Sequence, residues 1–370
     1  MHRDKPIRLP HILCFSTLQN WLRILARYGR YVDPGQLPRI LVMTIFIIMT
    51  LPFRLIESIL FSARIRRHEL SEPPVFIIGH WRSGTTNMHN HLLQDPQFAS
   101  VTLLHCAVPA AFLTSEGIAR RILKRRLPKS RPMDAVPLGI DEPMSEDFAL
   151  AGLTHMSHYL NYFFPRIAER TFRETVLFEN VSEADIRHWG NTYDFLLKKV
   201  SFAAGGRRLL LKNPPNVGRV REVLKRYPNA RFIHVYRNPW LVHASTMKLT
   251  ERFLEQMSFQ KCSREQMEEF VSTRYQLIMN QWLKDKSLIP AENLIEVSHE
   301  EMTRDPMTIL ETIYGRFSLP GWETVRPQME RYVESLRGYQ NNEYHFDSQT
   351  LARISPFLTA FADSAGYKGP

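Results

Sequence analysis

The chain has few cysteines, and none of them are paired in the sequence. Only three occur in 370 residues: Cys14, Cys106 and Cys262. They are far apart and form no C-x-x-C pair, which argues against a disulfide framework and against a zinc site. We therefore expect free thiols in a reducing compartment and a cytoplasmic location.

The chain also lacks a long uninterrupted hydrophobic segment. Its main apolar run, Ile40–Phe53, has 14 residues between Arg39 and Arg54 and contains Pro52. A membrane span needs roughly 18 or more. A buried helix and a helix at a membrane interface remain open, and a spanning helix is the least favoured. No secretory signal is expected, because the first apolar run comes too late.

Basic residues outnumber acidic ones, giving a formal net charge of +11 and a pI near 9.6. This balance favours anionic partners such as phosphorylated small molecules or an acidic membrane surface. Residues 120–131, RRILKRRLPKSR, hold seven basic side chains. They form either a solvated helix end or a contact with anionic lipid or an anionic acceptor. The apolar N-terminal segment and this basic run together suggest peripheral association with a membrane. Nucleic acid is disfavoured, because no recognition motif accompanies the charge.

The chain divides near Pro73-Pro74, since proline favours an extended or turn entry to a domain. Residues 1–70 are expected to form an apolar and basic helical extension, and residues 71–370 the main domain. The expected strands are nearly continuous apolar runs: Val75–Ile78, Arg208–Leu211, Arg231–Tyr236 and Asn293–Val297. Helical patterns lie between them: Thr86–Leu93, Val217–Arg226, Trp240–Glu255, Ser263–Trp282 and Met307–Arg316. This alternation predicts an α/β fold with a central parallel sheet.

The segment VFIIGHWRSGTT has the spacing of a phosphate-binding loop between a strand and a helix. Gly79 and Gly84 allow close approach of the backbone to an anion. Arg82 adds charge, and hydroxyl groups follow at Thr85 and Thr86. Thr85 occupies the position that a lysine holds in ATP-binding loops. Such a loop suits a ligand with one 5′-phosphate group and no terminal phosphate pair.

A second block, RLLLKNPPNVGRVREVLKRYPNARFIHVYRNPWLVHASTMKL, contains further anion-binding groups. Lys212 follows one expected strand and Arg237 follows the next. Ser245 comes eight residues after Arg237, on the following helix. This spacing can bring a guanidinium and a hydroxyl onto one anionic group.

With both blocks, the chain resembles the sulfotransferases that use 3′-phosphoadenosine-5′-phosphosulfate (PAPS), over roughly residues 73–367. The resemblance implies a P-loop-like three-layer α/β fold. It assigns the 5′-phosphosulfate to the R-S-G-T-T loop: Arg82, Ser83, Gly84, Thr85 and Thr86. It assigns the 3′-phosphate to Arg237 and Ser245, and Lys212 matches a lysine of bacterial-type members. It implies sulfuryl transfer to a hydroxyl or amine, release of adenosine 3′,5′-bisphosphate (PAP), and no metal.

Catalysis would rely on positioning, electrostatics and a general base. We expect Lys212 and Arg82 to stabilise the departing bisphosphate. Asn216 stands where many bacterial-type relatives have a histidine, which favours a glutamate base. Glu142 and Glu146 are the candidates, and they share one helix face if their segment is helical. Both can also be read as an acidic cluster stabilised by the helix dipole.

Three histidines are candidates for contact with the substrate: His80, His155 and His158. The acceptor is expected to be a lipid-linked or amphiphilic hydroxyl compound, with a carbohydrate as the main competitor. Two rival functions remain open from the sequence. One is a phosphotransferase of the P-loop kinase type, and the other is a catalytically inactive scaffold of the same fold that binds nucleotide or membrane.

Overall fold

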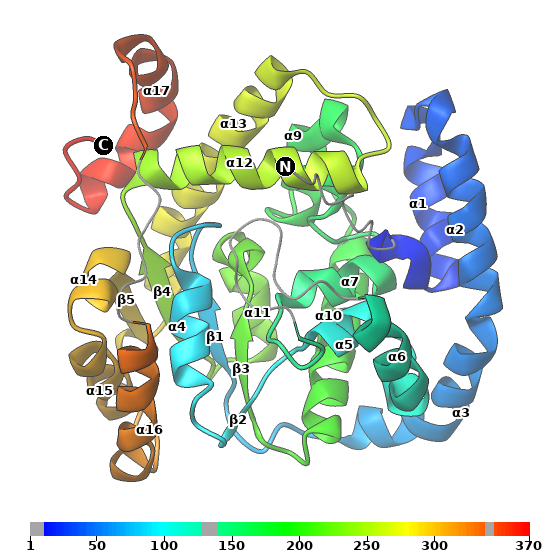
Figure 1. Ribbon diagram of the computed structural model, residues 1–370, viewed down its shortest axis with the longest axis horizontal. Helices are drawn as coiled ribbons and strands as arrows, with labels where there is room; N and C mark the ends of the chain where they lie inside the picture. Colours follow the sequence, from blue (N-terminus) through cyan, green and yellow to red (C-terminus); the bar gives the residue numbers. More distant parts are fainter. Residues whose placement is uncertain (1–10, 127–138, 337–343) are drawn as a thin grey trace.

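A parallel β-sheet forms the centre of the computed structural model, which describes residues 11–126, 139–336 and 344–370 (Figure 1). Within these ranges the sheet has five strands in the order β2-β3-β1-β4-β5, all parallel. The strands are β1 (Val75–Ile78), β2 (Phe98–Ala99), β3 (Arg208–Lys212), β4 (Arg231–Tyr236) and β5 (Leu294–Ser298).

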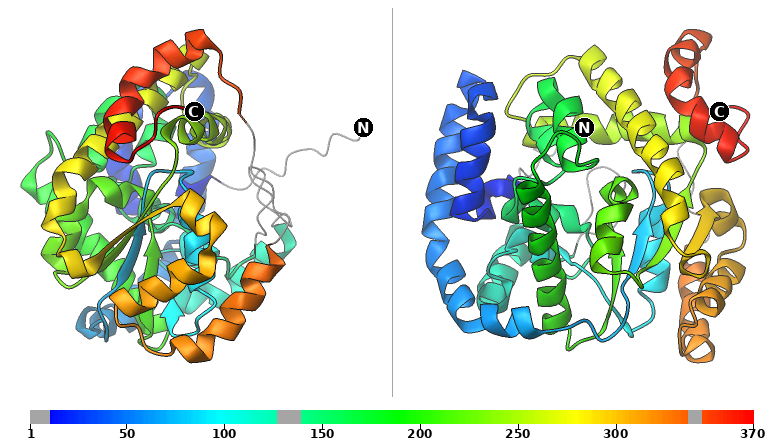
Figure 2. Two further views of the ribbon diagram at one scale, coloured as in Figure 1. Left: turned by 90° about the vertical axis from the view of Figure 1, so that its left-hand side faces the viewer. Right: turned by 180° about the vertical axis from the view of Figure 1, so that it is seen from behind.

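Helices surround the sheet on both faces (Figures 1 and 2). Before β3 they are α1 (Leu18–Tyr28), α2 (Leu37–Met49), α3 (Leu51–Arg67), α4 (Thr85–Leu92), α5 (Leu103–Ala107), α6 (Phe112–Arg126), α7 (Glu146–Leu153), α8 (Leu160–Phe163), α9 (Ala168–Thr175) and α10 (Glu183–Ala203). After β3 they are α11 (Val220–Arg226), α12 (Pro239–Met257), α13 (Arg264–Asp285), α14 (His299–Arg304), α15 (Pro306–Arg316), α16 (Trp322–Ser335) and α17 (Ser348–Ser364).

Alternating strand residues enter two separate cores. Val75 and Ile77 pack with residues of α4, α14, α15 and α16. Phe76 and Ile78 point the other way, into a larger core shared with α7 and α10 to α13. Because both faces are covered, the strands are mostly apolar, as expected for buried parallel strands. The predicted α/β fold is therefore confirmed.

The expected strands and helices lie where the sequence placed them, with shifts of a few residues at their ends. The structure adds β2, which is too short to show a period in the sequence. It also adds α10 and the C-terminal helices α16 and α17. The basic segment 120–131 continues α6 as far as Arg126, and residues 127–131 lie outside the described residues.

The N-terminal segment is helical and shares the larger core through Trp21, Met43 and Ile47, among others. Its helices lie along one edge of the molecule, opposite α14 to α17 (Figures 1 and 2). The apolar run Ile40–Phe53 is divided between α2 and α3, and most of its side chains are exposed. The interpretation of this run as a buried core helix is therefore wrong.

No single helix in the described ranges has the length and hydropathy required to cross a membrane. The pair Pro34–Met49 and Leu51–Arg67, bent by 41°, meets that requirement only when its halves are counted together. The bend falls at Thr50, and Pro52 lies in the first turn of α3, where its missing N–H costs no helical hydrogen bond.

Candidate active site

The loop after β1 is pressed closely against the strand beside it. Gly79 has φ +149°, and a Cβ there would lie 2.1 Å from the Val235 carbonyl oxygen of β4. Gly84 has φ +100° and is the N-cap of α4, and a Cβ there would lie 2.6 Å from Nδ1 of His299. Neither position can take a side chain in this conformation. The Ser83 hydroxyl donates to the Val235 carbonyl at 2.7 Å, so it fastens the loop to the sheet.

Arg82 connects this loop to α12. Its Nε donates to Oγ of Ser245 at 2.9 Å, across 163 residues of sequence, and its φ is +70°. That left-handed conformation is uncommon for a residue with a side chain and occurs preferentially at functional sites. The two motifs that the sequence predicted to bind one nucleotide are therefore in direct contact.

Arg237 follows β4 at the same edge of the sheet. Its Nε is buried and has no hydrogen-bond partner. Burial lowers the pKa of Arg237. The nearby Glu300 carboxylate acts to raise this pKa, and the Arg82 cation lowers it further. A buried guanidinium N–H without a partner and beside a second cation is a costly arrangement. An anion bound there would relieve both costs.

Lys212 ends β3 and pairs in register with Ile77, the residue two before Gly79. Its side chain is buried. Its backbone N–H donates to Oε1 of Glu146 at 2.8 Å. Glu146 therefore also lies at the carboxyl edge of β3, beside the loop.

Glu146 is fully buried, and its Oε2 has no hydrogen-bond partner. Burial raises the pKa of Glu146 to about 8, although the Lys212 cation acts in the opposite direction. A carboxyl group with a pKa near neutrality, at the edge of a ligand loop, has the properties of a general acid or base.

Glu142 does not share the helix of Glu146, so the predicted common helix face is wrong. Helix α7 begins at Glu146, and Glu142 lies in a bend four residues earlier. The physical reason is Pro143, because a residue before proline avoids the helical conformation. Glu142 instead accepts from the Leu103 N–H through its backbone carbonyl, and its charge raises the pKa of Tyr332 in addition to the larger effect of burial.

A buried polar cluster holds the start of α7 against the end of β3. Asp147 Oδ2 accepts from Arg219 at 2.6 Å and from Asn213 at 2.8 Å. Its Oδ1 accepts from the Ser157 hydroxyl at 3.0 Å. Burial acts to raise the pKa of Asp147, but the Arg219 cation holds it well below its ordinary value. The cluster thereby fixes the positions of the neighbouring residues, Glu146 and Lys212.

We expect Asp147→Asn to lower the free energy of unfolding by about 3 kcal/mol, because it leaves the buried Arg219 cation without its counter-charge. Chemical denaturation at neutral pH measures this. The pKa of Asp147 is lower in the folded than in the unfolded protein. Its contribution to the free energy of unfolding is therefore complete above the unfolded pKa near 3.8 and is lost progressively as the pH falls from there toward the folded pKa.

Asp141→Asn is the matched control for this substitution. Asp141 also pairs with an arginine, Arg120, but its side chain is 70% exposed. An exposed pair contributes less than about 1 kcal/mol. Equal effects of the two substitutions would show that the buried cluster does not hold α7 in place.

The predicted histidines occupy three different environments. His80 belongs to the loop and its side chain is buried, and this burial, followed by the Arg274 cation, lowers its pKa to about 3. His158 is buried with its ring 5.3 Å from that of Trp81 in the loop. His155 is not brought to the loop, because its Nε2 lies 3.0 Å from Oδ1 of Asp185 on α10.

Sequence reasoning missed His299 and Asp147. His299 directly follows β5 and packs behind Gly84. The rule that ligand groups gather at the carboxyl ends of parallel strands could have drawn attention to His299. Asp147 is adjacent to a predicted residue, but its partners Arg219 and Asn213 lie about 70 residues away and no local pattern indicates them. Asn216, at the position of the missing histidine, is buried and donates to the Tyr193 hydroxyl at 2.9 Å.

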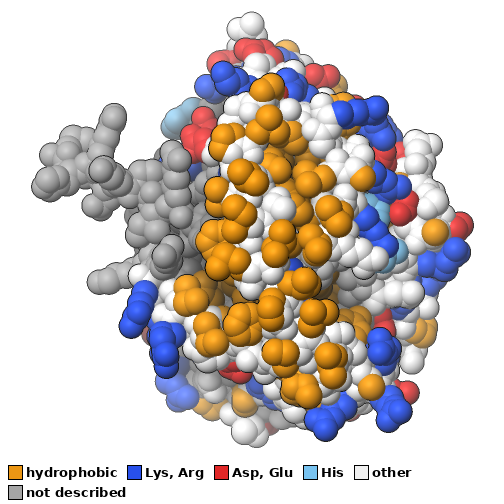
Figure 3. All heavy atoms as spheres, turned by 90° about the vertical axis from the view of Figure 1, so that its right-hand side faces the viewer, with side chains coloured by type: hydrophobic (Ala, Val, Ile, Leu, Met, Phe, Trp, Pro, Cys, Tyr) orange, Lys and Arg blue, Asp and Glu red, His pale blue; other side chains and the backbone are white. Residues whose placement is uncertain are grey.

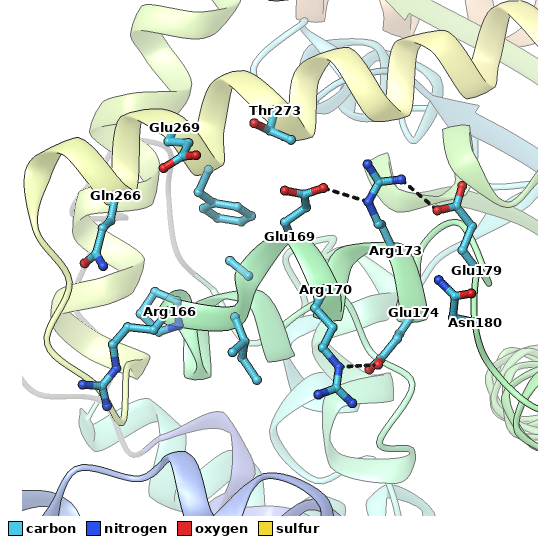
Figure 4. Close-up of a pocket in the computed structure, with 14 residues that line it drawn as sticks. Arg166, Glu169, Arg170, Arg173, Glu174, Glu179, Asn180, Gln266, Glu269 and Thr273 are labelled. Atoms are coloured by element: carbon cyan, nitrogen blue, oxygen red, sulfur yellow. Dashed lines mark hydrogen bonds and ion pairs between the residues drawn. The ribbon is translucent and has the colours of Figure 1, made fainter.

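A separate cavity of about 770 Å³ lies between α9 and the start of α13 (Figure 4). Most of its charged side chains form ion pairs: Arg170 with Glu174, and Arg173 with both Glu169 and Glu179. Arg166 pairs with Asp33, which lies outside the cavity lining. None of the predicted ligand residues line it. Because most of these charges are paired, we assign the cavity no ligand. Among the described residues, no group of three or more His, Cys, Asp or Glu side chains is placed to hold a metal ion.

Comparisons with known proteins agree with this geometry. Residues 73–324 match the model of the Sulfotransferase family. The omega-hydroxy-beta-dihydromenaquinone-9 sulfotransferase Stf3 of Mycobacterium bovis is 25% identical over 347 residues, covering 94% of this chain and 89% of that protein.

Two solved structures share the fold. Sulfotransferase STF9 from Mycobacterium avium superposes with a TM-score of 0.69 at 17% identity, covering 96% of this chain and 98% of that one. Sulfotransferase STF1 from Mycobacterium tuberculosis H37Rv gives 0.61 at 14% identity, covering 91% and 90%. The chain therefore belongs to the sulfotransferase family and is a PAPS-dependent enzyme that transfers a sulfuryl group to an acceptor hydroxyl.

Proposed function

We propose that the loop Gly79–Thr86 holds the 5′-phosphosulfate of PAPS and that Arg237 and Ser245 bind its 3′-phosphate. The observation that carries this proposal is the Arg82–Ser245 hydrogen bond, which joins two motifs distant in sequence. The partnerless Nε of Arg237 supports it, since a phosphate oxygen would supply the missing acceptor. Ser83 would contribute its backbone, because its hydroxyl already binds β4.

In the proposed reaction the acceptor oxygen attacks sulfur in line. A bond forms between that oxygen and sulfur, and the bond from sulfur to the 5′-phosphate oxygen breaks. Negative charge develops on the leaving PAP, where Arg82 and Lys212 would stabilise it. Glu146 would take the proton of the acceptor hydroxyl. Its buried carboxyl group, hydrogen-bonded to the Lys212 backbone beside the loop, supports this role over that of Glu142.

We propose a hydroxylated lipid as the acceptor. The Mycobacterium bovis relative is named for a hydroxylated menaquinone, which is an amphiphilic compound of this class. The many apolar side chains exposed on α2 and α3 support work at a membrane surface. We therefore also propose that the protein is cytoplasmic and associates peripherally with a membrane. A carbohydrate acceptor is the competing possibility.

The test is a transfer assay with PAPS labelled in its sulfuryl group. Detergent-dispersed lipids bearing a terminal hydroxyl are compared with oligosaccharides and with the same lipids lacking the hydroxyl. We expect label in the hydroxylated lipid alone, with an equal amount of PAP released. Label in the oligosaccharide alone would show that the acceptor class is wrong. Binding of PAP without transfer to either class would show that neither class is the acceptor.

A further inference from the structure

The outward surface of α2 and α3 is largely apolar, as is the neighbouring surface of α6. The exposed side chains are Leu37, Leu41, Val42, Ile45, Phe46, Ile48, Met49, Phe53, Leu55, Ile56, Ile59 and Leu60, with Ile118 and Ile122 from α6. We call these residues the apolar face. Figure 3 shows hydrophobic side chains forming a broad band there, with Lys and Arg around its margins. Ile59 is 81% exposed, Met49 67% and Leu41 62%.

Two charged residues in the first half of α3 point inward. Arg54 is 8% exposed and Glu57 is 3% exposed. Glu57 accepts from the backbone N–H groups of Leu113 at 2.7 Å and Thr114 at 2.9 Å, and it forms an ion pair with buried Lys199. Before its last turn, helix α3 therefore directs its charged side chains toward the protein and Ile59 toward the outside. This is the reverse of a helix in contact with water, and it fits an apolar surrounding medium.

Basic side chains border the apolar face at one end. Arg64, Arg66 and Arg67 are exposed at the end of α3. Helix α6, which packs against α3, adds exposed Arg121, Lys124 and Arg125. Glu57 is the only acidic residue from Leu37 to Arg67, and it is buried. Apolar side chains with a purely basic margin on α3 complement a bilayer that carries anionic headgroups.

We propose that the apolar face rests on an anionic lipid bilayer, with α2 and α3 lying in the interface. The inner sides of both helices pack on the protein through Met43, Ile47 and Ile65, so lipid can reach only their outer sides. This favours a helix pair lying on the membrane over one that crosses it. The proposed membrane association would take place through this surface, and lipid binding there does not depend on sulfuryl transfer.

The experiment is co-sedimentation of the full-length protein with vesicles. One set contains phosphatidylcholine alone, and the other contains equal parts of phosphatidylcholine and phosphatidylglycerol. We expect binding to the anionic vesicles that weakens with added salt, and much weaker binding to the neutral ones. The combined variant Leu41→Asp, Met49→Asp, Ile59→Asp should bind the anionic vesicles roughly tenfold more weakly or worse, because binding scales with buried apolar area.

Leu288→Asp is the matched control, since Leu288 is an exposed apolar residue outside the apolar face. It should bind like the unaltered chain. Thermal stabilisation by PAP should persist in all variants, which shows that they are folded and separates this test from that of nucleotide binding. Three results would overturn the proposal: no vesicle binding by the unaltered protein, equal binding by the triple variant, or a solution dimer that the triple variant dissociates. Equal binding to both vesicle types would show that anionic headgroups are not required.

Discussion

Arg237→Ala is expected to weaken PAP binding about 100-fold or more, which corresponds to roughly 3 kcal/mol. The substitution removes a desolvated guanidinium proposed to bind the 3′-phosphate. Isothermal titration with PAP and with adenosine 5′-monophosphate measures the effect. The unaltered protein should prefer PAP, and the variant should bind both compounds with similar affinity, because only PAP carries the 3′-phosphate.

The ligand-free protein provides a second readout. The Nε of Arg237 has no partner, and burial opposes its charge, so the apo variant should melt at the same temperature or higher. Only the stabilisation by PAP should disappear. Arg252→Ala is the control. It removes the same charge from an exposed position on α12. If Arg237→Ala lowers the melting temperature and leaves PAP binding intact, the residue is structural.

The strands and the tight loop after β1 could be predicted from the sequence because both are local patterns. Val75–Ile78 and Arg231–Tyr236 are β-rich apolar runs, and the structure has strands with the same bounds. The backbone approaches closely at Gly79, and only glycine, which has no side chain, fits there. Buried parallel strands and tight turns can be recognised in a sequence, because few residue types fit them.

The rest of the site depends on contacts between distant segments. The Asp147–Arg219 pair spans 72 residues, and the Ser83 hydroxyl donates to the carbonyl of Val235, 152 residues away. Sequence spacing could not separate Glu142 from Glu146, because their difference lies in burial and in the start of α7 after Pro143. The exposure of α2 and α3 was equally undetermined, since a run of apolar residues looks the same when it faces a core or a membrane.

Glu146→Gln is expected to lower the rate of sulfuryl transfer roughly 10²- to 10⁴-fold, the usual range for loss of a general base. The amide retains an oxygen that can accept from the Lys212 N–H, so α7 and β3 should stay in place. PAP binding should change little. Single-turnover transfer from PAPS to the hydroxylated lipid measures the rate, and titration with PAP measures binding.

The pH profile of kcat/KM distinguishes a base from a structural carboxyl group. Burial raises the pKa of Glu146 to about 8, so below that pH most molecules carry the proton and cannot accept another. The rate should rise with pH, by up to tenfold per unit, and level off above about pH 9. Glu146→Gln should remove this rise, whereas Glu142→Gln should keep both the rise and most of the activity. The opposite pattern would transfer the role of the base to Glu142, and an unchanged profile in both variants would exclude both carboxylates, leaving the proton to be taken by another group or by solvent.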